Sequence, residues 1–429
     1  MILARSLVPI GYHQLRNLAK LVLGRPLTMV SYSSMTLDED DVQLVEIWLR
    51  KRREWYRTDE IEEYHAQFAA WNGSAYAFSF MGGRVALSAI IYALGLRPGD
   101  EVILPGYTCV VVPNSFHYAG VKTVYGDIEL GTYGLDAAQV EAKITPKTRA
   151  IMLHHLYGLV CRDYDEIVNI ARQYNLFVIE DCAQSTGAEY KGRKVGNLGD
   201  VAFYSSERSK VFNTVQGGIA VTNDEELAAR IRNYYEKAPL PDEILIEKQL
   251  STLIFNYYRH KHPQRWWRGD WAWLRYSDKI LTSATEEEKQ GIRPAHYGQK
   301  MPAPIAAIGL NQLAKIDRYN QQRRLTARHW AAWCDKLGYQ KPLIITDSTP
   351  VYLRYPVIVK PEKKRDTAWA TRRFRINHLG DWFVSHIHPT DQRVDGCPNA
   401  DIAIGQCINL PTLMPPELKV LLPEKAVSN

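Results

Sequence analysis

The sequence contains no long uninterrupted run of apolar residues. A helix that crosses a bilayer needs about 20 successive apolar residues, and each apolar stretch of this chain is interrupted sooner by polar or charged residues. We therefore expect no membrane-spanning helix. Hydrophobic residues make up 46% of the chain and charged residues 23%, which excludes a mostly disordered or collagen-like protein.

Cysteine is scarce, and its spacing matches neither a disulfide framework nor a metal site. The chain has six cysteines in 429 residues, none in a C-x-x-C pair and none grouped with histidines at zinc-binding spacing. His386 and His388 have no third ligand nearby. We therefore expect free thiols, a reducing cytoplasmic location and no metal site.

An excess of charge of one sign is also nearly absent. The 53 basic and 47 acidic residues leave a formal net charge of +6, and the basic residues are dispersed. A nucleic-acid-binding surface would need a denser basic patch, so we expect no nucleic acid partner. The small positive excess suits an anionic substrate.

The N-terminal residues 1–34 are predicted to form an arm and not a secretory signal. The apolar stretch after Arg5 is short and is broken by Pro9 and Gly11. Residues 13–24 predict a short basic helix with one apolar face. Such a helix can lie on a membrane surface, but we expect it to pack on its own protein.

The middle of the chain alternates between strand and helix patterns. Apolar runs bounded by glycine and proline predict strands at 101–104, 123–125, 150–154, 176–179, 201–204 and 218–221. The segments around them predict helices at 84–95, 111–119, 163–174 and 224–236. This alternation predicts an α/β fold with a mostly parallel sheet between helices, and with ligands at the carboxyl ends of the strands.

The flanking segments complete a prediction of three units. Residues 38–70 predict helices, 303–335 predict one or two helices, and shorter signals after about 350 predict a small α+β domain. The predicted units are the arm at 1–34, a large domain at 35–295, and an interdomain helix with a small C-terminal domain at 296–429.

Residues 237–295 depart from this alternation and are treated as an insertion in the large domain. They include Trp266, Trp267, Trp271 and Trp273 among several arginines. Such residues can stack on a sugar or base and bind a diphosphate, or lie at a membrane interface. They can also pack across a dimer interface, which we favour.

An acid and a lysine follow neighbouring predicted strands. Asp181 comes directly after one strand, and Lys210 lies in the loop after the next. The carboxyl ends of parallel strands meet at one edge of a sheet, so the two side chains could hold a flat ligand between them. Pyridoxal phosphate needs such a pair, a lysine for a Schiff base and an acid for its pyridine nitrogen. Acid–lysine pairs are more often surface ion pairs, so this pair alone leaves the function open.

Longer motifs surround this pair. They include GDEVILP at 99–105, HLYG at 155–158, EDCAQ at 180–184, GG at 217–218 and AAIG at 306–309. In this order they resemble the DegT/StrS family of pyridoxal-phosphate-dependent aminotransferases that act on nucleotide-linked keto sugars. The resemblance extends from about 35 to 425 and implies the aspartate-aminotransferase fold, known as fold type I.

The resemblance implies roles for three residues around the cofactor ring. Lys210 would bind the cofactor as a Schiff base and move the proton during catalysis. Asp181 would pair with the pyridine nitrogen, and Gln184 would lie close to the ring. No metal ligand is implied.

At the phosphate, the resemblance implies a hydrogen bond from Ser205 and a helix start at Gly83, where free N–H groups suit a dianion. Several positions depart from the family pattern, one of them Glu207, which replaces a histidine three residues before the lysine. Arg84 replaces a threonine, Cys109 replaces the aromatic residue that stacks on the ring, and the partner-subunit asparagine falls on Gly298. Arg84 could replace the lost phosphate contact or form a surface salt bridge, and Tyr107 could replace the stacking ring.

The resemblance implies a homodimeric aminotransferase with its active site between two subunits. It would move an amino group from an amino acid, expected to be L-glutamate, to a nucleotide-linked keto sugar for a surface polysaccharide or a glycosylated metabolite. Two alternatives stay open. A sugar dehydratase of the same fold is disfavoured because Lys210 is retained. A non-catalytic regulatory or scaffold protein stays open because of the changes at Arg84 and Cys109, but the aminotransferase is the preferred interpretation.

Overall fold

The computed structural model describes residues 30–32, 35–258, 281, 284–295, 297–376, 394, 396–414 and 419. The predicted helix at 13–24, the tryptophans at 266–273 and the two histidines at 386 and 388 lie outside this part of the chain. Among the described residues, no helix is long and apolar enough to cross a membrane.

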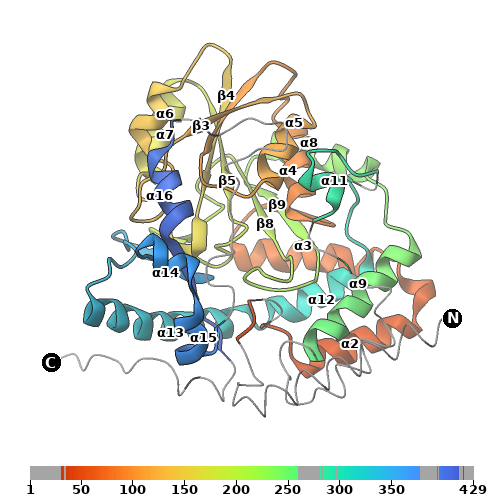
Figure 1. Ribbon diagram of the computed structural model, residues 1–429. Coiled ribbons are helices and arrows are strands. Elements are labelled where there is room, and N and C mark those ends of the chain that lie inside the picture. Colours follow the sequence, from red (N-terminus) through yellow and green to blue (C-terminus); the bar gives the residue numbers. More distant parts are fainter. Residues whose placement is uncertain are drawn as a thin grey trace.

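A seven-stranded sheet forms the centre of the molecule (Figure 1). Its strands are β1 (Tyr76–Phe80), β2 (Glu101–Pro105), β3 (Lys122–Gly126), β4 (Thr148–His154), β5 (Phe177–Asp181), β8 (Val201–Ser205) and β9 (Gly218–Thr222). Their spatial order is β1-β9-β8-β5-β4-β2-β3. The five strands from β8 to β3 are parallel, and β9 runs antiparallel to both of its neighbours. The predicted α/β sheet is confirmed, and the sequence analysis missed only β1 among these strands.

Side-chain alternation gives the sheet two buried faces. On β2, Val102 and Leu104 pack on one face with α4 (Gly83–Ala93), whereas Ile103 packs on the other. Helices α5 (Val111–His117) and α8 (Glu225–Lys237) lie near α4 (Figure 1). The opposite core includes residues of α2 (Glu39–Arg50), α3 (Asp59–Asn72), α7 (Tyr164–Gln173) and α12 (Ala303–Leu313). Both faces are covered, as a parallel sheet requires.

The first part of the 237–295 segment is an ordered helix, α9 (Glu243–Asn256), which the sequence analysis missed. The side chain of Asp242 accepts from the Leu245 N–H and caps it. Its residues from Gln249 to Asn256 are all buried, polar ones included, so it has no amphipathic stripe. The absence of that stripe is why hydrophobic periodicity did not reveal it.

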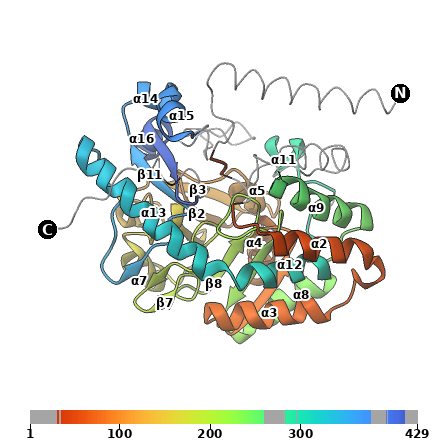
Figure 2. The same cartoon turned by 90° about the horizontal axis from the view of Figure 1, so that it is seen from below.

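The C-terminal part has its own core around a two-stranded antiparallel sheet, β11 (Arg354–Ile358) with β12 (Cys407–Pro411). Helix α13 (Ile316–Leu337) runs from α12 toward this part, so that 303–335 forms two helices (Figure 2). Trp330 on α13 packs edge-on against Phe374, with ring centroids 5.1 Å apart. The remaining helices here are α14 (Pro361–Arg365), α15 (Ala368–Phe374) and α16 (Pro398–Gln406).

Several short elements connect these layers. They are the 3-10 helices η1 (Arg52–Glu54) and η2 (Leu156–Gly158), the helices α6 (Ala137–Ala142) and α11 (Glu286–Lys289), and a small sheet of β6 (Glu189–Tyr190), β7 (Arg193–Lys194) and β10 (Ser348–Thr349). Helix α11 packs beside α4 and α5.

Candidate active site

A cavity of about 220 Å³ lies at the carboxyl ends of the central strands. This is the edge where ligands collect in open parallel sheets. The structure brings together in its wall all seven residues that the sequence analysis selected: Gly83, Arg84, Cys109, Asp181, Gln184, Ser205 and Lys210. The first and the last of them, Gly83 and Lys210, are more than 120 positions apart in the chain.

Asp181 is the last residue of β5 and lies buried in the cavity wall. Its Oδ1 accepts a hydrogen bond from the Ala183 N–H at 2.9 Å. Burial raises the pKa of Asp181, and this effect outweighs the opposing influence of that N–H and of the Lys210 charge. A buried carboxylate of this kind gains most from a cationic partner inside the cavity.

Lys210 lies in the loop that joins β8 to β9, and helices from later in the chain hold this loop. Its backbone N–H donates to the carbonyl of Glu207 at 2.8 Å. The buried Arg323 of α13 donates to the Val211 carbonyl at 2.7 Å, and the buried Gln249 of α9 donates to the Thr214 carbonyl at 2.8 Å. The lysine therefore projects from a loop with fixed backbone geometry.

Helix α4 begins at the cavity, against the ends of β8 and β9. A Cβ added to Gly83 would lie 3.0 Å from the Ser205 Cβ, and one added to Gly218 would lie 2.3 Å from the Gly82 carbonyl carbon. Only glycine permits this close approach. It places the N–H groups of the helix start beside the Ser205 hydroxyl, which is an arrangement suited to an anion.

Arg84, the second residue of α4, forms an ion pair with Glu288 of α11. The two side chains are only 16% and 5% exposed, so this is not a surface salt bridge. Burial opposes the charge of Arg84, but the Glu288 carboxylate outweighs burial and raises the pKa of Arg84. The guanidinium stays charged in the cavity wall, and its role at a phosphate stays a prediction.

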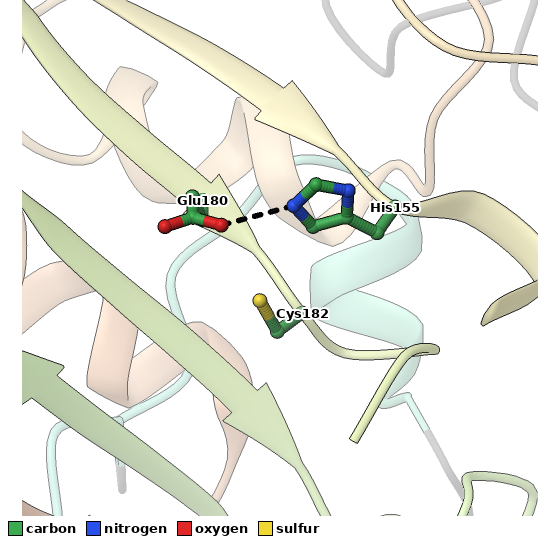
Figure 3. A group of neighbouring side chains, drawn as sticks. All are labelled: His155, Glu180 and Cys182. Atoms are coloured by element: carbon green, nitrogen blue, oxygen red, sulfur yellow. Dashed lines mark hydrogen bonds and ion pairs between the residues drawn. The ribbon is translucent and has the colours of Figure 1, made fainter. Parts of the chain in front are cut away.

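His155, Glu180 and Cys182 form a buried cluster beside the cavity (Figure 3). Their ligand atoms lie within 4.8 Å of one another, which is close enough to suggest a metal site. However, both ring nitrogens of His155 are engaged, Nε2 with Glu180 at 3.0 Å and Nδ1 with the Cys161 N–H at 3.3 Å. The Glu180 carboxylate also accepts from the N–H groups of Gly196, Leu198 and Gly199. We therefore interpret the cluster as a hydrogen-bond network that fixes the end of β5.

Comparison with known families agrees with this geometry. The sequence model of the DegT/DnrJ/EryC1/StrS aminotransferase family matches residues 35–418. The chain belongs to this family. The resemblance inferred from the motifs is thereby confirmed over most of the chain.

This chain is similar in sequence to named proteins and in fold to a solved structure. GDP-perosamine synthase of Caulobacter vibrioides is 45% identical over 172 residues, 40% of this chain and 46% of that protein. The dTDP-3-amino-3,6-dideoxy-alpha-D-galactopyranose transaminase of Aneurinibacillus thermoaerophilus is 41% identical over 308 residues, 71% of this chain and 72% of that protein. The match thus spans about half the length of the first relative. The structure of DesV from S. venezuelae, in complex with a ketimine intermediate, superposes with a TM-score of 0.68 at 25% identity over 92% of this chain and 97% of DesV.

Cys109, which the resemblance predicts at the ring-stacking position, does lie in the cavity, and its stacking role stays a prediction. Cys109 is half-buried in the cavity wall. Tyr107 does not replace the ring, because it packs in the C-terminal core and its hydroxyl contacts the Tyr157 hydroxyl at 2.7 Å. A thiol can contact an aromatic face but covers less of it than a ring.

The sequence analysis missed His154, the last residue of β4. It pairs in register with Asp181 and lies in the cavity wall. Its Nε2 contacts the Tyr133 carbonyl at 2.7 Å, its Nδ1 is buried with no hydrogen-bond partner, and burial lowers its pKa to about 4. The ring is therefore neutral at neutral pH. Its Nε2 donates to the Tyr133 carbonyl, and its Nδ1 is the acceptor. Its position at the end of a predicted strand, like that of Asp181, was the signal that could have identified it.

Proposed function

We propose that this protein is a pyridoxal-phosphate-dependent aminotransferase that acts on a nucleotide-linked keto sugar. The observation that carries the proposal is the pairing of Asp181 and Lys210 in one cavity, at neighbouring strand ends, in a member of an aminotransferase family. Asp181 suits the pyridine nitrogen of this cofactor, and Lys210 suits its aldehyde.

The shape of the cavity also fits the cofactor. The glycines at 83 and 218 permit a close approach that a Cβ would block, and they bring the start of α4 next to Ser205. The helix start and Ser205 would hold the phosphate. Gln184, whose Oε1 accepts from the Tyr157 N–H at 3.0 Å, would lie close to the ring, with Cys109 against one face.

Each of these residues would have a separate role at the cofactor. The cofactor supplies an electron sink for carbon-centred charge. The buried Asp181 carboxylate would hold the pyridine nitrogen and keep it protonated, because an opposite charge favours the protonated form. The Lys210 amine would hold the cofactor at its aldehyde, and its Nζ would move the proton at the substrate α-carbon. Arg84 would contribute positive charge at the phosphate.

The substrates are proposed from the names of relatives and from the charge of the chain. Relatives named for GDP-linked and dTDP-linked amino sugars support a nucleotide-linked sugar as the acceptor. The net charge of +6 suits such an anion. We expect L-glutamate as the amino donor, a homodimer with the active site between its subunits, and a cytoplasmic location in keeping with six free cysteines.

The first experiment is an absorption spectrum of the purified protein with pyridoxal phosphate, before and after L-glutamate is added. We expect the band of lysine-bound cofactor to form and then to be bleached by glutamate, as a transaminase half-reaction requires. Lys210→Ala is the control and should form no such band. A band that glutamate leaves unchanged would favour another donor or a different reaction, and no band in the wild type would favour the scaffold alternative.

A further inference from the structure

The ion pair between Arg84 and Glu288 joins the wall of the cavity to helix α11, none of whose residues line it. Arg84 lies in the cavity wall, at the start of α4. Glu288 is not part of that wall but contacts the guanidinium, although the two residues are 204 positions apart in the chain. Helix α11, which carries Glu288, lies close to α4 and α5 (Figure 1).

Glu288 is itself held in place by several contacts. Its Oε2 accepts from the Thr285 N–H at 2.9 Å, and the Thr285 hydroxyl accepts from the Glu288 N–H at 3.2 Å, which is a capping box. Its carbonyl accepts from the Asn114 side chain of α5 at 2.8 Å. The Tyr297 hydroxyl binds the Arg84 carbonyl at 3.0 Å. A carboxylate held in its own capping box, on a helix that is tied to α5, is a fixed support and not a mobile counter-ion.

We propose that Glu288 is a positioning residue that aims the Arg84 guanidinium at the phosphate end of the cavity. Helix α11 would thereby take part in cofactor binding without lining the cavity itself. This inference rests on the proposed function, because it presumes that a phosphate binds at the start of α4. A guanidinium suits this role, since its planar set of five N–H donors can engage a carboxylate and a phosphate on different edges.

Electrostatics predicts the direction in which phosphate affinity changes when Glu288 is removed, and this direction can be tested. If Glu288 only neutralised Arg84, its removal would leave an uncompensated positive charge and would tighten phosphate binding. If Glu288 orients Arg84, its removal weakens phosphate binding although the net charge becomes more positive. The two explanations therefore predict opposite changes in affinity.

The test is Glu288→Gln, with pyridoxal phosphate and pyridoxal as the two probes. Glutamine at this position preserves the capping box but not the ion pair. We expect the dissociation constant for pyridoxal phosphate to rise about ten-fold, the scale of a lost charge-assisted contact, and that for pyridoxal to stay unchanged. Equilibrium dialysis measures both constants without any reliance on activity.

Two further variants complete the experiment. Glu287→Gln makes the same charge change at an exposed neighbour on α11 and should leave both constants unchanged. In an Arg84→Gln background, Glu288→Gln should have no additional effect, because the two residues act as a unit. Unchanged or tighter pyridoxal phosphate binding by Glu288→Gln, or equal weakening of both probes, would overturn the inference. A wild-type protein that binds neither probe would instead refute the proposed function.

Discussion

At the scale of single residues, the site depends on a charge that the protein buries at some cost. Asp181 is surrounded by protein, and burial raises its pKa. A buried carboxylate destabilises the folded protein, and its negative charge becomes favourable only when a cation is bound beside it. The same principle applies to Arg84, where Glu288 already supplies the opposite charge.

Replacement of Asp181 by asparagine should therefore stabilise the cofactor-free protein but weaken cofactor binding. The folded pKa of Asp181 lies above its unfolded value of about 3.9. The stability of the cofactor-free protein thus falls as the pH rises from that value through the folded pKa, where the buried carboxyl loses its proton. At neutral pH, Asp181→Asn should raise the melting temperature of the cofactor-free protein by about 2 °C, as measured by calorimetry.

The same variant should bind pyridoxal phosphate at least about ten-fold more weakly, because a charge-assisted contact is lost. Asp335→Asn, whose side chain is 56% exposed, is the control and should change neither quantity. A cofactor-free Asp181→Asn protein that is less stable than the wild type would show that the carboxylate is well solvated or paired within the fold.

At the scale of elements, the site is made by the close approach of one helix to two strand ends. Helix α4 begins against β8 and β9, and the contact leaves no space for a Cβ at residue 218. The local sequence predicted the helix and both strands, because hydrophobic periodicity reports them. It did not predict their separation, which depends on packing between elements.

Gly218→Ala should therefore damage both the fold and the site. The new Cβ would lie 2.3 Å from Gly82 and Gly83 backbone atoms, so the start of α4 must move. We expect a loss of about 1–3 kcal/mol in the free energy of unfolding, as for overpacked cores, together with weaker pyridoxal phosphate binding. Urea denaturation and equilibrium dialysis measure the two effects.

Gly405→Ala is the matched control for this substitution. Gly405 lies in α16, and a Cβ there would meet nothing within 4 Å. It should leave cofactor affinity unchanged and raise the free energy of unfolding by up to about 1 kcal/mol, the helix-propensity difference between alanine and glycine. If Gly218→Ala matched this control in both measurements, the close approach at the start of α4 would be excluded.

At the scale of the whole molecule, the site draws on distant parts of the chain. The Lys210 loop receives hydrogen bonds from α9 and α13, and the start of α4 receives an ion pair from α11. The homodimer and the division into an arm, a large domain and a small domain remain predictions. The role of the tryptophan cluster, which lies outside the described residues, remains one as well.

The dimer prediction can be tested by mass measurement in solution. We expect a mass of twice the 49.1 kDa chain, persisting at the concentrations used for catalysis. An active site between subunits should also lose specific activity on dilution below the dissociation constant of the dimer. A species with the mass of one chain and undiminished specific activity would contradict this prediction.

The sequence by itself determined six of the seven strands of the central sheet, the helix that begins at the cavity, and the position of Asp181 and Lys210 after neighbouring strands. These features follow from periodicity and from residues close together in the chain, and such local patterns do not depend on contacts with distant residues. Only the tertiary structure decided that Arg84 pairs with Glu288, that Tyr107 turns away from the cavity, and that His154 joins its wall. Such contacts depend on how elements distant in sequence pack together, and no local pattern encodes that packing.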